Sequence, residues 1–436
     1  MKEKLNHFFD GKKVLILGFG REGRSTLDLI KEFNCMIGIA DQNLAVTPEL
    51  EQYELFTGEK YLDAISGYDI VMKSPGIALF DKISEKDTAK ITGQTDLLLK
   101  FCENKIIGVT GTKGKSTTSS LVHHILEHSG KKSVLIGNIG IPPLSIVDSI
   151  EKDTIIVCEM SCHQLEYVQA SPNIAVLLNI YEEHLDHYVD FDAYKRAKEN
   201  IYRFQNCNDV LIYNRECHTN ELDAVPSKKI SASQNEKADI YISGKDITLY
   251  GKTIPYEKIA PKLEGEHNLY NIAIALVAAK ECRCELEASI EAIRSFNGLE
   301  HRMELVRTLN GVKYINDSIS TIPLATINAV KAFSADTVII GGMDRGINYD
   351  VLVEYLNTGT VTNIICLPDS GYRIADMLDT VSEVFLVSDM EEAVGKAYEV
   401  TKKCCILSPA AASYGFYKNF EERGKHFKEL VNKLQI

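Results

Sequence analysis

The 436-residue chain contains no tryptophan, no low-complexity tract and no long apolar run. None of its apolar stretches approaches the roughly 18 uninterrupted residues that a membrane-spanning helix requires. Its first residues, Met-Lys-Glu-Lys-Leu-Asn, lack the apolar core of a secretory signal peptide. We therefore expect a soluble, cytoplasmic protein that has no membrane partner.

The eleven cysteines form neither a disulfide framework nor a zinc-binding pattern. The pairs Cys282-x-Cys284 and Cys404-Cys405 lack the repeated C-x-x-C spacing that a zinc site or redox motif would show. Reduced thiols are typical of proteins of the cytosol. The cysteine pattern therefore agrees with the expected location.

Positive charge is also scarce, because 48 lysines and arginines face 61 acidic residues, which gives a net charge of −13. Such a balance repels nucleic acid, so we expect no nucleic-acid partner. It still allows an anionic small molecule to be held by local donors. The length and the apolar fraction of 45% are typical of a globular enzyme with two or three domains.

The most informative segment is 107–118, in which an apolar strand runs into a glycine-rich turn and then a helix. Glycines let backbone amides close around phosphate oxygens, Lys115 can reach the terminal phosphates, and the Ser116 hydroxyl can ligate Mg²⁺. Val109 stands where the longer phosphate loop has glycine, so this is the shorter Thr-Gly-Thr-x-Gly-Lys-Ser form. A glycine turn with a surface lysine is the plainer alternative. We predict a triphosphate site formed by Gly111, Thr112, Lys113, Gly114, Lys115, Ser116 and Thr117.

The first block, 1–94, alternates short strands and helices in a Rossmann-like pattern. Lys13–Leu17 predicts a strand, Gly18-Phe-Gly-Arg-Glu-Gly23 a phosphate-binding turn, and Ser25–Phe33 a helix. Asp41 ends the next strand, about 20 residues after the turn. The pattern alone suggests NAD, but the same geometry serves any pyrophosphate with a ribose beside it. Nothing later in the chain resembles a hydride-transfer site.

The second block, 95–298, begins with the phosphate loop and a helix predicted over Thr117–Ser129. Its later strands end at polar residues, among them Asn138 and Glu159. Because the carboxyl ends of parallel strands meet at one edge of a sheet, these residues should converge on the bound triphosphate.

The third block, 299–436, is again a succession of strands and helices. Within the second block, Ser243-Gly-Lys-Asp246 predicts a hairpin and Asn271–Ala279 an alanine-rich helix.

The sequence therefore predicts an α/β protein with three domains. They are a Rossmann-like N-terminal domain (1–94), a central P-loop-type ATPase domain (95–298) and a C-terminal Rossmann-like domain (299–436).

Two acidic or histidine-containing strand ends are candidates for metal binding. Glu159 follows a strand, where a carboxylate is costly if it is buried alone, and it suits a Mg²⁺ ligand. A helix N-cap or an ion pair is the alternative. His184-x-x-His187 alone is a weak zinc signal, and we place His184 near a hard cation and the substrate. For His187 we expect a capping or solvated role.

Lys198 lies in a helix predicted over 192–204. At about 100° per residue it falls on one stripe with Tyr194 and Ile201. An inward ammonium is costly unless it is paired or chemically altered. A snorkelling lysine is the common alternative, and the spacing leaves both roles open.

Charged residues also stand at the beginning of the third block, in His301-Arg302 and Asn316-Asp317-Ser318. Arg302 suits a phosphate and Asp317 a ribose or Mg²⁺, with an interdomain salt bridge as the alternative. Near the C-terminus, small residues after a strand let a ligand approach, and nearby hydroxyls and cations could hold a carboxylate. A plain helix start is the alternative there. The residues concerned are Ser413, Lys418, Phe420 and Arg423.

Together these motifs resemble the Mur ligase family, and their order and spacing cover nearly the whole chain. The resemblance implies a UDP-binding, an ATPase and an amino-acid-binding domain, and an ATP-dependent amide ligase of peptidoglycan synthesis that forms an acyl phosphate. The segments that carry it are Thr110–Ser116, Glu159–Leu165, Asn179 to Asp186, Ala197-Lys198, Gly265–Asn271, His301-Arg302, Asn316–Ser318 and Ser408–Gly424.

The resemblance also implies catalytic and metal-binding roles. Lys115, His184 and Lys198 would be catalytic, and Lys198 would carry a carbamate that binds the second of two Mg²⁺ ions. The metal ligands would be Ser116, Glu159, His184 and Lys198. ATP would further contact Asn271, Arg302 and Asp317.

The implied substrates are UDP-N-acetylmuramoyl-L-alanine and glutamate, bound by a monomer. The nucleotide sugar would contact Gly18, Phe19, Gly20, Arg21, Asp41, Ser74, Gly76, Asn138 and Ser161. The incoming glutamate would contact Thr321, Arg345, Ser413 and Phe420.

Four positions depart from the family pattern. Cys162 replaces a serine, Glu183 an aspartate, and Gly415 an aspartate. Ile319 stands where many relatives have lysine, which removes a cation near the glutamate site. The resemblance implies the D-enantiomer of glutamate, and because Ile319 removes that cation, a ligase that uses L-glutamate is the alternative.

Three other functions compete with this reading. Another Mur-type ligase or a folylpolyglutamate synthase would share the central block, but the first and third blocks argue against it. A dinucleotide-dependent dehydrogenase would rest on Gly18 to Gly23 and Asp41 and would leave Lys115 without a role. A nucleotide-switched interaction module would bind ATP without amino-acid-dependent phosphate release.

Overall fold

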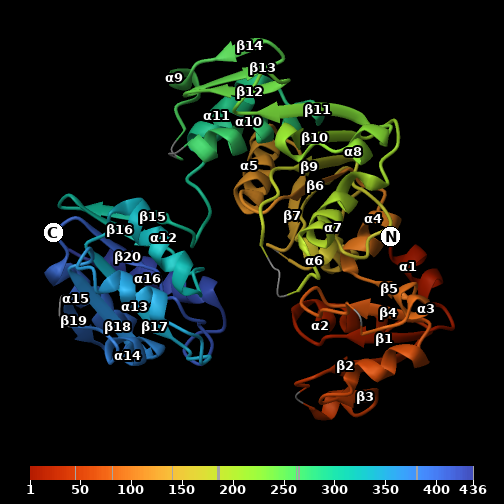
Figure 1. Cartoon of the computed structure of the whole chain (residues 1–436), viewed down its shortest axis with the longest axis horizontal. Helices are drawn as coiled ribbons and strands as arrows, with labels where there is room; N and C mark the ends of the chain where they lie inside the picture. The colour runs from red at the N-terminus through yellow and green to blue at the C-terminus, as the bar shows by residue number, and fades with distance from the viewer. Residues whose placement is uncertain are drawn as a thin grey trace. The chain divides into compact units, whose positions relative to one another are not determined.

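Three β-sheets organise the chain in the computed structural model (Figure 1). By internal packing the chain forms two units, Met1–Phe296 with two sheets and Asn297–Ile436 with one. The structure describes residues 1–44, 46–80, 82–139, 141–183, 187–261, 263, 266–379 and 382–435. The predicted α/β fold is confirmed, and no helix within these ranges is both long and apolar enough to span a bilayer.

The first sheet has five parallel strands in the order β3-β2-β1-β4-β5. Val14 to Leu17 are fully buried, as is typical of a parallel strand covered on both faces. The strands are β1 Lys13–Leu17, β2 Met36–Asp41, β3 Glu54–Thr57, β4 Ile70–Lys73 and β5 Ile91–Thr92. The helices are α1 Lys2–Phe9, α2 Arg21–Ile30, α3 Glu85–Thr88 and α4 Gln94–Phe101.

Helix α2 begins at Arg21, four residues before the predicted start, and ends at Ile30 instead of Phe33. The prediction assigned Gly23 to the turn, whereas it lies inside the helix. A Cβ on Gly23 would lie 2.1 Å from the carbonyl oxygen of Gly18. The third glycine therefore lets the helix pack closely on the strand, which shortens the turn.

The second sheet has nine strands in the order β14-β13-β12-β11-β10-β9-β6-β8-β7. Strands β6 to β11 pair in parallel, and β12 to β14 form an antiparallel end in which Ser243 pairs with Asp246. The predicted hairpin is confirmed. The strands are β6 Ile106–Thr110, β7 Ser133–Gly137, β8 Ile155–Glu159, β9 Ile174–Leu177, β10 Val210–Asn214, β11 Lys228–Ser233, β12 Ile240–Ser243, β13 Asp246–Leu249 and β14 Lys252–Ile254.

Helices α5, α10 and α11 pack together against this sheet and share its apolar core. Helix α5 begins at Lys115, two residues before the predicted start, because the left-handed Gly114 ends the loop directly before it. The helices of this part are α5 Lys115–His128, α6 Cys162–Leu165, α7 Phe191–Arg203, α8 Asn220–Ala224, α9 Tyr256–Ile259, α10 Glu266–Glu281 and α11 Leu286–Ser295.

The second unit is built on a six-stranded sheet in the order β15-β16-β20-β17-β18-β19. Among the described strands of this sheet, β15 at the edge is antiparallel to β16, and the other neighbouring strands pair in parallel. The carboxyl ends of β16, β20 and β17 therefore lie side by side at one edge of the sheet. The strands are β15 Glu304–Leu309, β16 Val312–Asn316, β17 Thr337–Gly342, β18 Asn363–Asp369, β19 Glu383–Leu386 and β20 Cys404–Leu407. The helices are α12 Pro323–Phe333, α13 Asp350–Leu356, α14 Ser370–Ala375, α15 Met390–Val400 and α16 Phe420–Lys433.

Candidate functional site

The phosphate loop, residues 110–116, joins β6 to α5 and has no room for side chains at two glycines. Gly114 has φ +87°, and a Cβ on it would lie 2.6 Å from Oδ1 of Asn271. A Cβ on Gly111 would lie 2.9 Å from Cβ of Leu178. The helix α10 residue Asn271 therefore lies beside the loop, where its Oδ1 also accepts a hydrogen bond from Thr118 at 3.3 Å.

The polar side chains of the loop are held by the loop itself and by its surroundings. Lys115 Nζ donates to the carbonyl oxygens of Gly111 and Thr112 at 2.8 and 3.0 Å, and burial lowers the pKa of this lysine. The Thr112 hydroxyl lies 2.8 Å from the Tyr194 hydroxyl. Lys113 is exposed and pairs with Glu183 at 2.6 Å. Ser116 and Thr117 occupy the first turn of α5.

Glu159 ends β8 and is fully buried. Its Oε1 accepts a hydrogen bond from Asn138 at 2.7 Å, and its Oε2 has no hydrogen-bond partner among the described residues. No cation among the described residues pairs with it, and Ser161, not Glu159, is the N-cap of the following helix. A buried carboxylate oxygen without a donor is the kind of ligand that a hard cation such as Mg²⁺ takes.

Lys198 is 1% exposed on α7, which excludes the snorkelling alternative. Its Nζ donates to the carbonyl oxygen of Gly111 at 2.9 Å and lies 4.7 Å from the centroid of the Tyr194 ring. No carboxylate among the described side chains pairs with it, and burial lowers its pKa to about 8. The helix stripe predicted from the sequence therefore delivers a buried amine to the phosphate loop.

His184 lies outside the described residues, so its predicted role stays a prediction. The predicted capping or solvated role of His187 is wrong, because its Nε2 contacts Glu166 at 3.3 Å and its side chain is only 9% exposed. Glu166 also pairs with the buried Lys73 at 3.3 Å, which the sequence reading missed. No group of three or more His, Cys, Asp or Glu side chains in the described ranges is arranged to hold a metal by itself.

The predicted nucleotide-sugar residues of the first sheet meet at the carboxyl ends of β1, β2 and β4. Asp41 Oδ2 accepts a hydrogen bond from the Phe19 amide at 2.7 Å, and the Ser74 hydroxyl donates to the Gly18 carbonyl at 2.9 Å. Gly20 precedes α2 and Arg21 begins it. Gly76 follows Ser74 in the loop after β4. These predicted residues therefore gather at one edge of the sheet, where hydrogen bonds join their loops.

The two remaining predicted sugar contacts lie on the second sheet. The backbone amide of Asn138 donates a hydrogen bond to the carbonyl oxygen of Glu159 at 2.9 Å, and its side-chain amide donates to Glu159 Oε1 at 2.7 Å. Ser161 caps α6 through a reciprocal bond with Gln164, whose amide also donates to Glu22 Oε1 at 2.8 Å. Gln164 thus links α6 to α2, a contact that the sequence did not predict.

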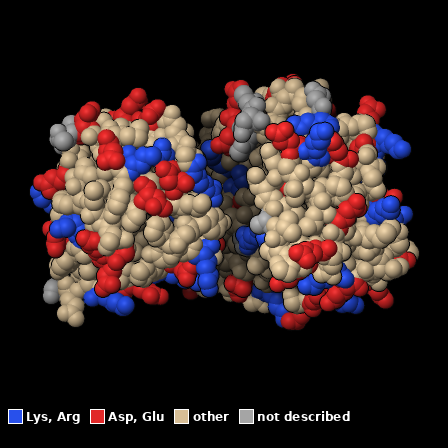
Figure 2. All heavy atoms as spheres, turned by 90° about the horizontal axis from the view of Figure 1, so that it is seen from below, with Lys and Arg blue, Asp and Glu red and all other residues tan. Residues whose placement is uncertain are grey.

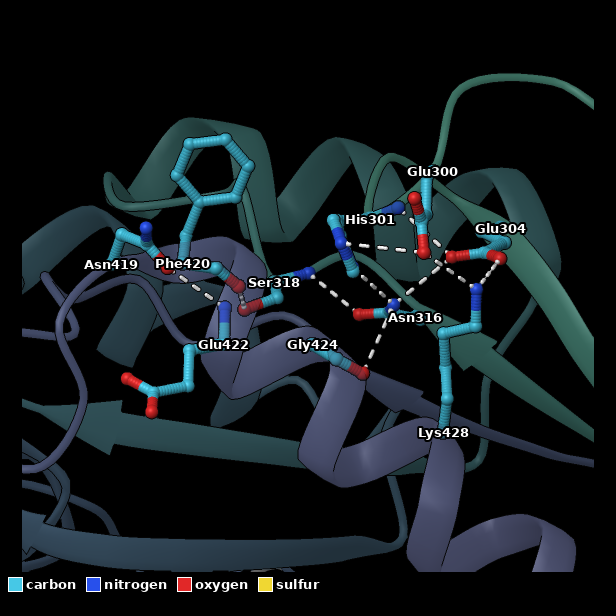
Figure 3. Close-up of polar contacts among 10 residues, drawn as sticks. All are labelled: Glu300, His301, Glu304, Asn316, Ser318, Asn419, Phe420, Glu422, Gly424 and Lys428. Atoms are coloured by element: carbon cyan, nitrogen blue, oxygen red, sulfur yellow. Dashed lines mark hydrogen bonds and ion pairs between the residues drawn. The ribbon is translucent and has the colours of Figure 1, made fainter.

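In the second unit, Asp317 is buried at the end of β16 (Figure 3 shows its neighbours). Its carboxylate accepts hydrogen bonds from Ser408 at 2.7 Å and from the Met303 amide at 3.1 Å, and burial raises its pKa. The adjacent Asn316 donates to His301 Nδ1 at 2.9 Å and to Glu304 at 3.0 Å (Figure 3). Arg302 is exposed beside this cluster.

The predicted glutamate residues follow β16, β17 and β20, which end side by side. Ser413 is buried, and Thr321 and Phe420 are half-buried. Arg345 is exposed, with its guanidinium 5.7 Å from the centroid of the Tyr414 ring. The helix-start alternative holds for Phe420 and Arg423, because α16 begins at Phe420 with Asn419 as its N-cap, whereas Ser413 and Lys418 lie in the loop 408–419 before it.

The distribution of charge on the surface is consistent with the prediction that the protein binds small anions through a few local donors rather than through a basic surface. Figure 2 shows acidic and basic side chains interspersed on the visible face, with no continuous basic surface among the described residues there. The net charge of −13 points the same way.

Comparison with known proteins places these features in one family. The family described as Mur ligase middle domain matches residues 109–279. A UDP-N-acetylmuramoylalanine–D-glutamate ligase from Clostridium botulinum (strain Langeland) is 32% identical over 460 residues, with 99% of each chain covered. The enzyme of that name from Clostridioides difficile (strain 630) is 34% identical, with 98% of this chain and 99% of the relative covered.

Two solved structures share the fold. The UDP-N-acetylmuramate–alanine ligase MurC from Thermotoga maritima is 19% identical with a TM-score of 0.57, and 97% of this chain and 99% of that chain are covered. The MurF ligase of the same organism, in complex with ADP, is 17% identical with a TM-score of 0.53, and the covered shares are 98% and 97%.

Proposed function

This chain belongs to the Mur ligase family, and from that premise we propose that it joins D-glutamate to UDP-N-acetylmuramoyl-L-alanine. It is an ATP-dependent acid–amino-acid ligase of peptidoglycan synthesis. The observation that carries the proposal is the 32% identity over 99% of both chains to a ligase of that name. The buried lysines and carboxylate around the phosphate loop support it, because they suit the transfer of a phosphoryl group.

We propose that the three sheets correspond to three domains with separate ligands. Residues 1–94 would bind the nucleotide sugar, 95–298 ATP, and 299–436 the amino acid. The polar edge at Gly18, Asp41 and Ser74 supports the first assignment. We further propose a cytoplasmic monomer, which light scattering on the purified protein would test.

The first chemical step would transfer the γ-phosphoryl group of ATP to the alanyl carboxylate of the nucleotide sugar. A bond forms between a carboxylate oxygen and the γ-phosphorus, the bond to the β–γ bridging oxygen breaks, and ADP leaves. Both reactants are anions, so the repulsion between them must be reduced before they can meet. Lys115 would leave its two loop carbonyls and bind the phosphates, while Gly111 to Thr117 donate backbone hydrogen bonds.

The residues at the phosphate loop fit bound Mg²⁺. The unpartnered Oε2 of Glu159 is an available oxygen ligand, and Ser116, Lys198 as a carbamate and His184 would complete two sites. When bound, Mg²⁺ supplies charge neutralisation to the phosphates. Asn138 would hold Glu159 in place through its 2.7 Å hydrogen bond and would also contact the substrate.

We propose that Lys198 reacts with CO₂ to give a carbamate. The neutral amine forms the new N–C bond and loses one proton, so a cation becomes an anionic oxygen ligand. The burial of the amine, its position 2.9 Å from Gly111 and the absence of a carboxylate partner among the described residues all support this change. The charged ammonium would otherwise face the metal site.

In the second step the neutral glutamate amine would attack the acyl-phosphate carbonyl, and the tetrahedral intermediate would expel phosphate. His184 and the carboxylate groups near the metal are the candidate bases for the amine proton. In the second unit Asp317 and Arg302 would hold ATP, and Thr321, Arg345, Ser413 and Phe420 the glutamate. Excluding water would protect the acyl phosphate from hydrolysis.

A coupled assay of phosphate release tests the function. We expect release with ATP, UDP-N-acetylmuramoyl-L-alanine and D-glutamate together, and none when any one is omitted. Release with L-glutamate instead would contradict the prediction that the substrate is the D-enantiomer. The missing cation at Ile319 would then be the expected cause of the changed preference. Turnover with a folate, reduction of NAD, or ATP binding without release would each support a competing function.

Arg345→Ala and Ser413→Ala should each raise the KM for glutamate by about 10-fold or more and leave the KM for ATP within about twofold. The reason is that each removes a hydrogen bond to a charged group, worth about 1.5–3 kcal/mol. Steady-state kinetics with each substrate varied in turn would measure both effects.

The control is Lys396→Ala, which removes a half-buried cation of the same unit that pairs with Glu399. It should change neither KM. Unchanged saturation by glutamate in the Arg345 and Ser413 variants would remove both residues from the proposed subsite.

A further inference from the structure

Arg423 is the largest fully buried side chain described, with 1% of its surface exposed. It lies in the first turn of α16, where an arginine would ordinarily reach solvent. No carboxylate in the described ranges pairs with it, and burial lowers its pKa to about 10. A buried guanidinium without a counter-ion is costly, so its position calls for an explanation.

The guanidinium joins two loops of the second unit. Its Nε donates to the Ser318 hydroxyl at 3.0 Å, and its Nη2 donates to the carbonyl oxygens of Ser318 and Ala411 at 2.8 and 3.0 Å. Ser318 follows β16, and Ala411 follows β20. The Ser318 hydroxyl in turn donates to the Phe420 carbonyl at 2.8 Å, which fixes the start of α16 (Figure 3 shows Ser318 and Phe420).

The remaining nitrogen, Nη1, is buried without a hydrogen-bond partner among the described residues. It lies against the end of β17, because a Cβ on Gly342 would be 3.1 Å from it. Gly342 has φ +141°, and that Cβ would also lie 2.6 Å from the Ala412 carbonyl. The guanidinium therefore sits where the ends of β16, β20 and β17 meet, and only glycine fits above it.

The two loops that the guanidinium joins, and the loop after β17 that packs against it, carry proposed glutamate contacts. Thr321 follows Ser318, Arg345 follows Gly342, and Ser413 follows Ala411 in the chain. Ile319, directly after Ser318, supplies no charge at this edge. A carboxylate bound there would thus meet positive charge from Arg345 and from the buried guanidinium behind the loops.

We propose that Arg423 is a positioning residue for the incoming amino acid, which holds the three loops in register and places an uncompensated positive charge behind the carboxylate subsite. The inference rests on the proposed function. A positioning role differs from a role in folding alone, because the guanidinium charge of Arg423 has no carboxylate partner among the described residues. Lys428 lies on the same helix α16, but its charge is neutralised by ion pairs with Glu300 and Glu304 (Figure 3).

Arg423→Lys and Arg423→Met in the full chain test the proposal. Lysine keeps the charge and methionine keeps part of the volume, so the KM for glutamate should rise in the order wild type, Lys, Met. We expect a rise of about 10- to 100-fold for Met, with the KM for ATP within about twofold. Discrimination between the glutamate enantiomers should fall in the same order, since the loops lose their fixed spacing.

Two further variants keep the test decisive. Ser318→Ala removes the Nε acceptor and leaves the arginine, so it should raise the glutamate KM even if Arg423→Met does not fold. Lys428→Ala removes two ion pairs from the same helix and should leave the glutamate KM unchanged. Equal glutamate KM values in wild type and in the Lys and Ser318 variants, or a matching rise in Lys428→Ala, would overturn the proposal.

The outcomes also separate this inference from the function on which it rests. Wild-type protein that releases no phosphate with D-glutamate would refute the proposed function. Wild-type protein that turns over, with Arg423→Lys and Arg423→Met that saturate normally and lose only thermal stability, would refute the positioning role alone.

Discussion

Lys198→Ala should lower the glutamate-dependent rate by about 10²- to 10³-fold, the usual cost of removing one electrostatic group from a site that transfers charge. Lys198 is buried against Gly111, and its pKa of about 8 leaves more neutral amine near neutral pH than a surface lysine has. The neutral amine is the form that reacts with CO₂. Initial rates at saturating substrates would measure the loss.

Short carboxylic acids such as formate or acetate should restore part of the activity of Lys198→Ala, because they can supply the missing oxygen ligand. Lys195→Ala, on the same helix α7, is the matched control and should keep wild-type activity without rescue. A carbonyl signal from ¹³C-labelled CO₂ should appear in wild type and be absent from Lys198→Ala. Full activity in the plain Lys198→Ala variant would remove the carbamate from the mechanism.

Lys115→Met should lower the rate by about 10³-fold and weaken magnesium-dependent ATP binding. The ammonium is confined at the phosphate loop by two carbonyl oxygens, within reach of any phosphate that the loop holds. Methionine fills the same volume without charge, so the protein should fold normally. Calorimetric titration with ATP and Mg²⁺, together with the phosphate-release assay, would measure both changes.

Lys132→Ala serves as the control for Lys115→Met. Lys132 is an exposed lysine after the same helix, paired with Glu151 and Asp153. Its loss should leave ATP binding and turnover unchanged. Undiminished ATP uptake by Lys115→Met would contradict the assignment of this loop to the nucleotide, and with it the chemistry proposed above.

The sequence predicted best those features that neighbouring residues create. The phosphate loop, the strand before it and the helix after it occupy one short segment, so glycine spacing was enough to find them. The buried stripe on α7 was predictable for the same reason, since helical periodicity placed Lys198 with Tyr194 and Ile201. The errors in secondary structure fell at helix boundaries, and Gly23 and Lys115 proved to be inside the helices.

Contacts between distant segments could not be predicted in this way. Asn271 reaches the phosphate loop only because α10 packs against α5, and 153 residues separate it from Thr118. Lys73, Glu166 and His187 meet from three separate elements. The motif around Arg423 was visible in the sequence, but its hydrogen bonds to Ser318 and Ala411 depend on how three strands end together.

The separate cores on either side of the Phe296–Asn297 link affect how the protein's stability should be measured. Two cores can melt at different temperatures, so one transition temperature would average two events. The absence of tryptophan makes this worse, because tyrosines such as Tyr194 and Tyr314 report from both units at once. Hydrogen exchange, which resolves opening segment by segment, would show which half a given substitution loosens.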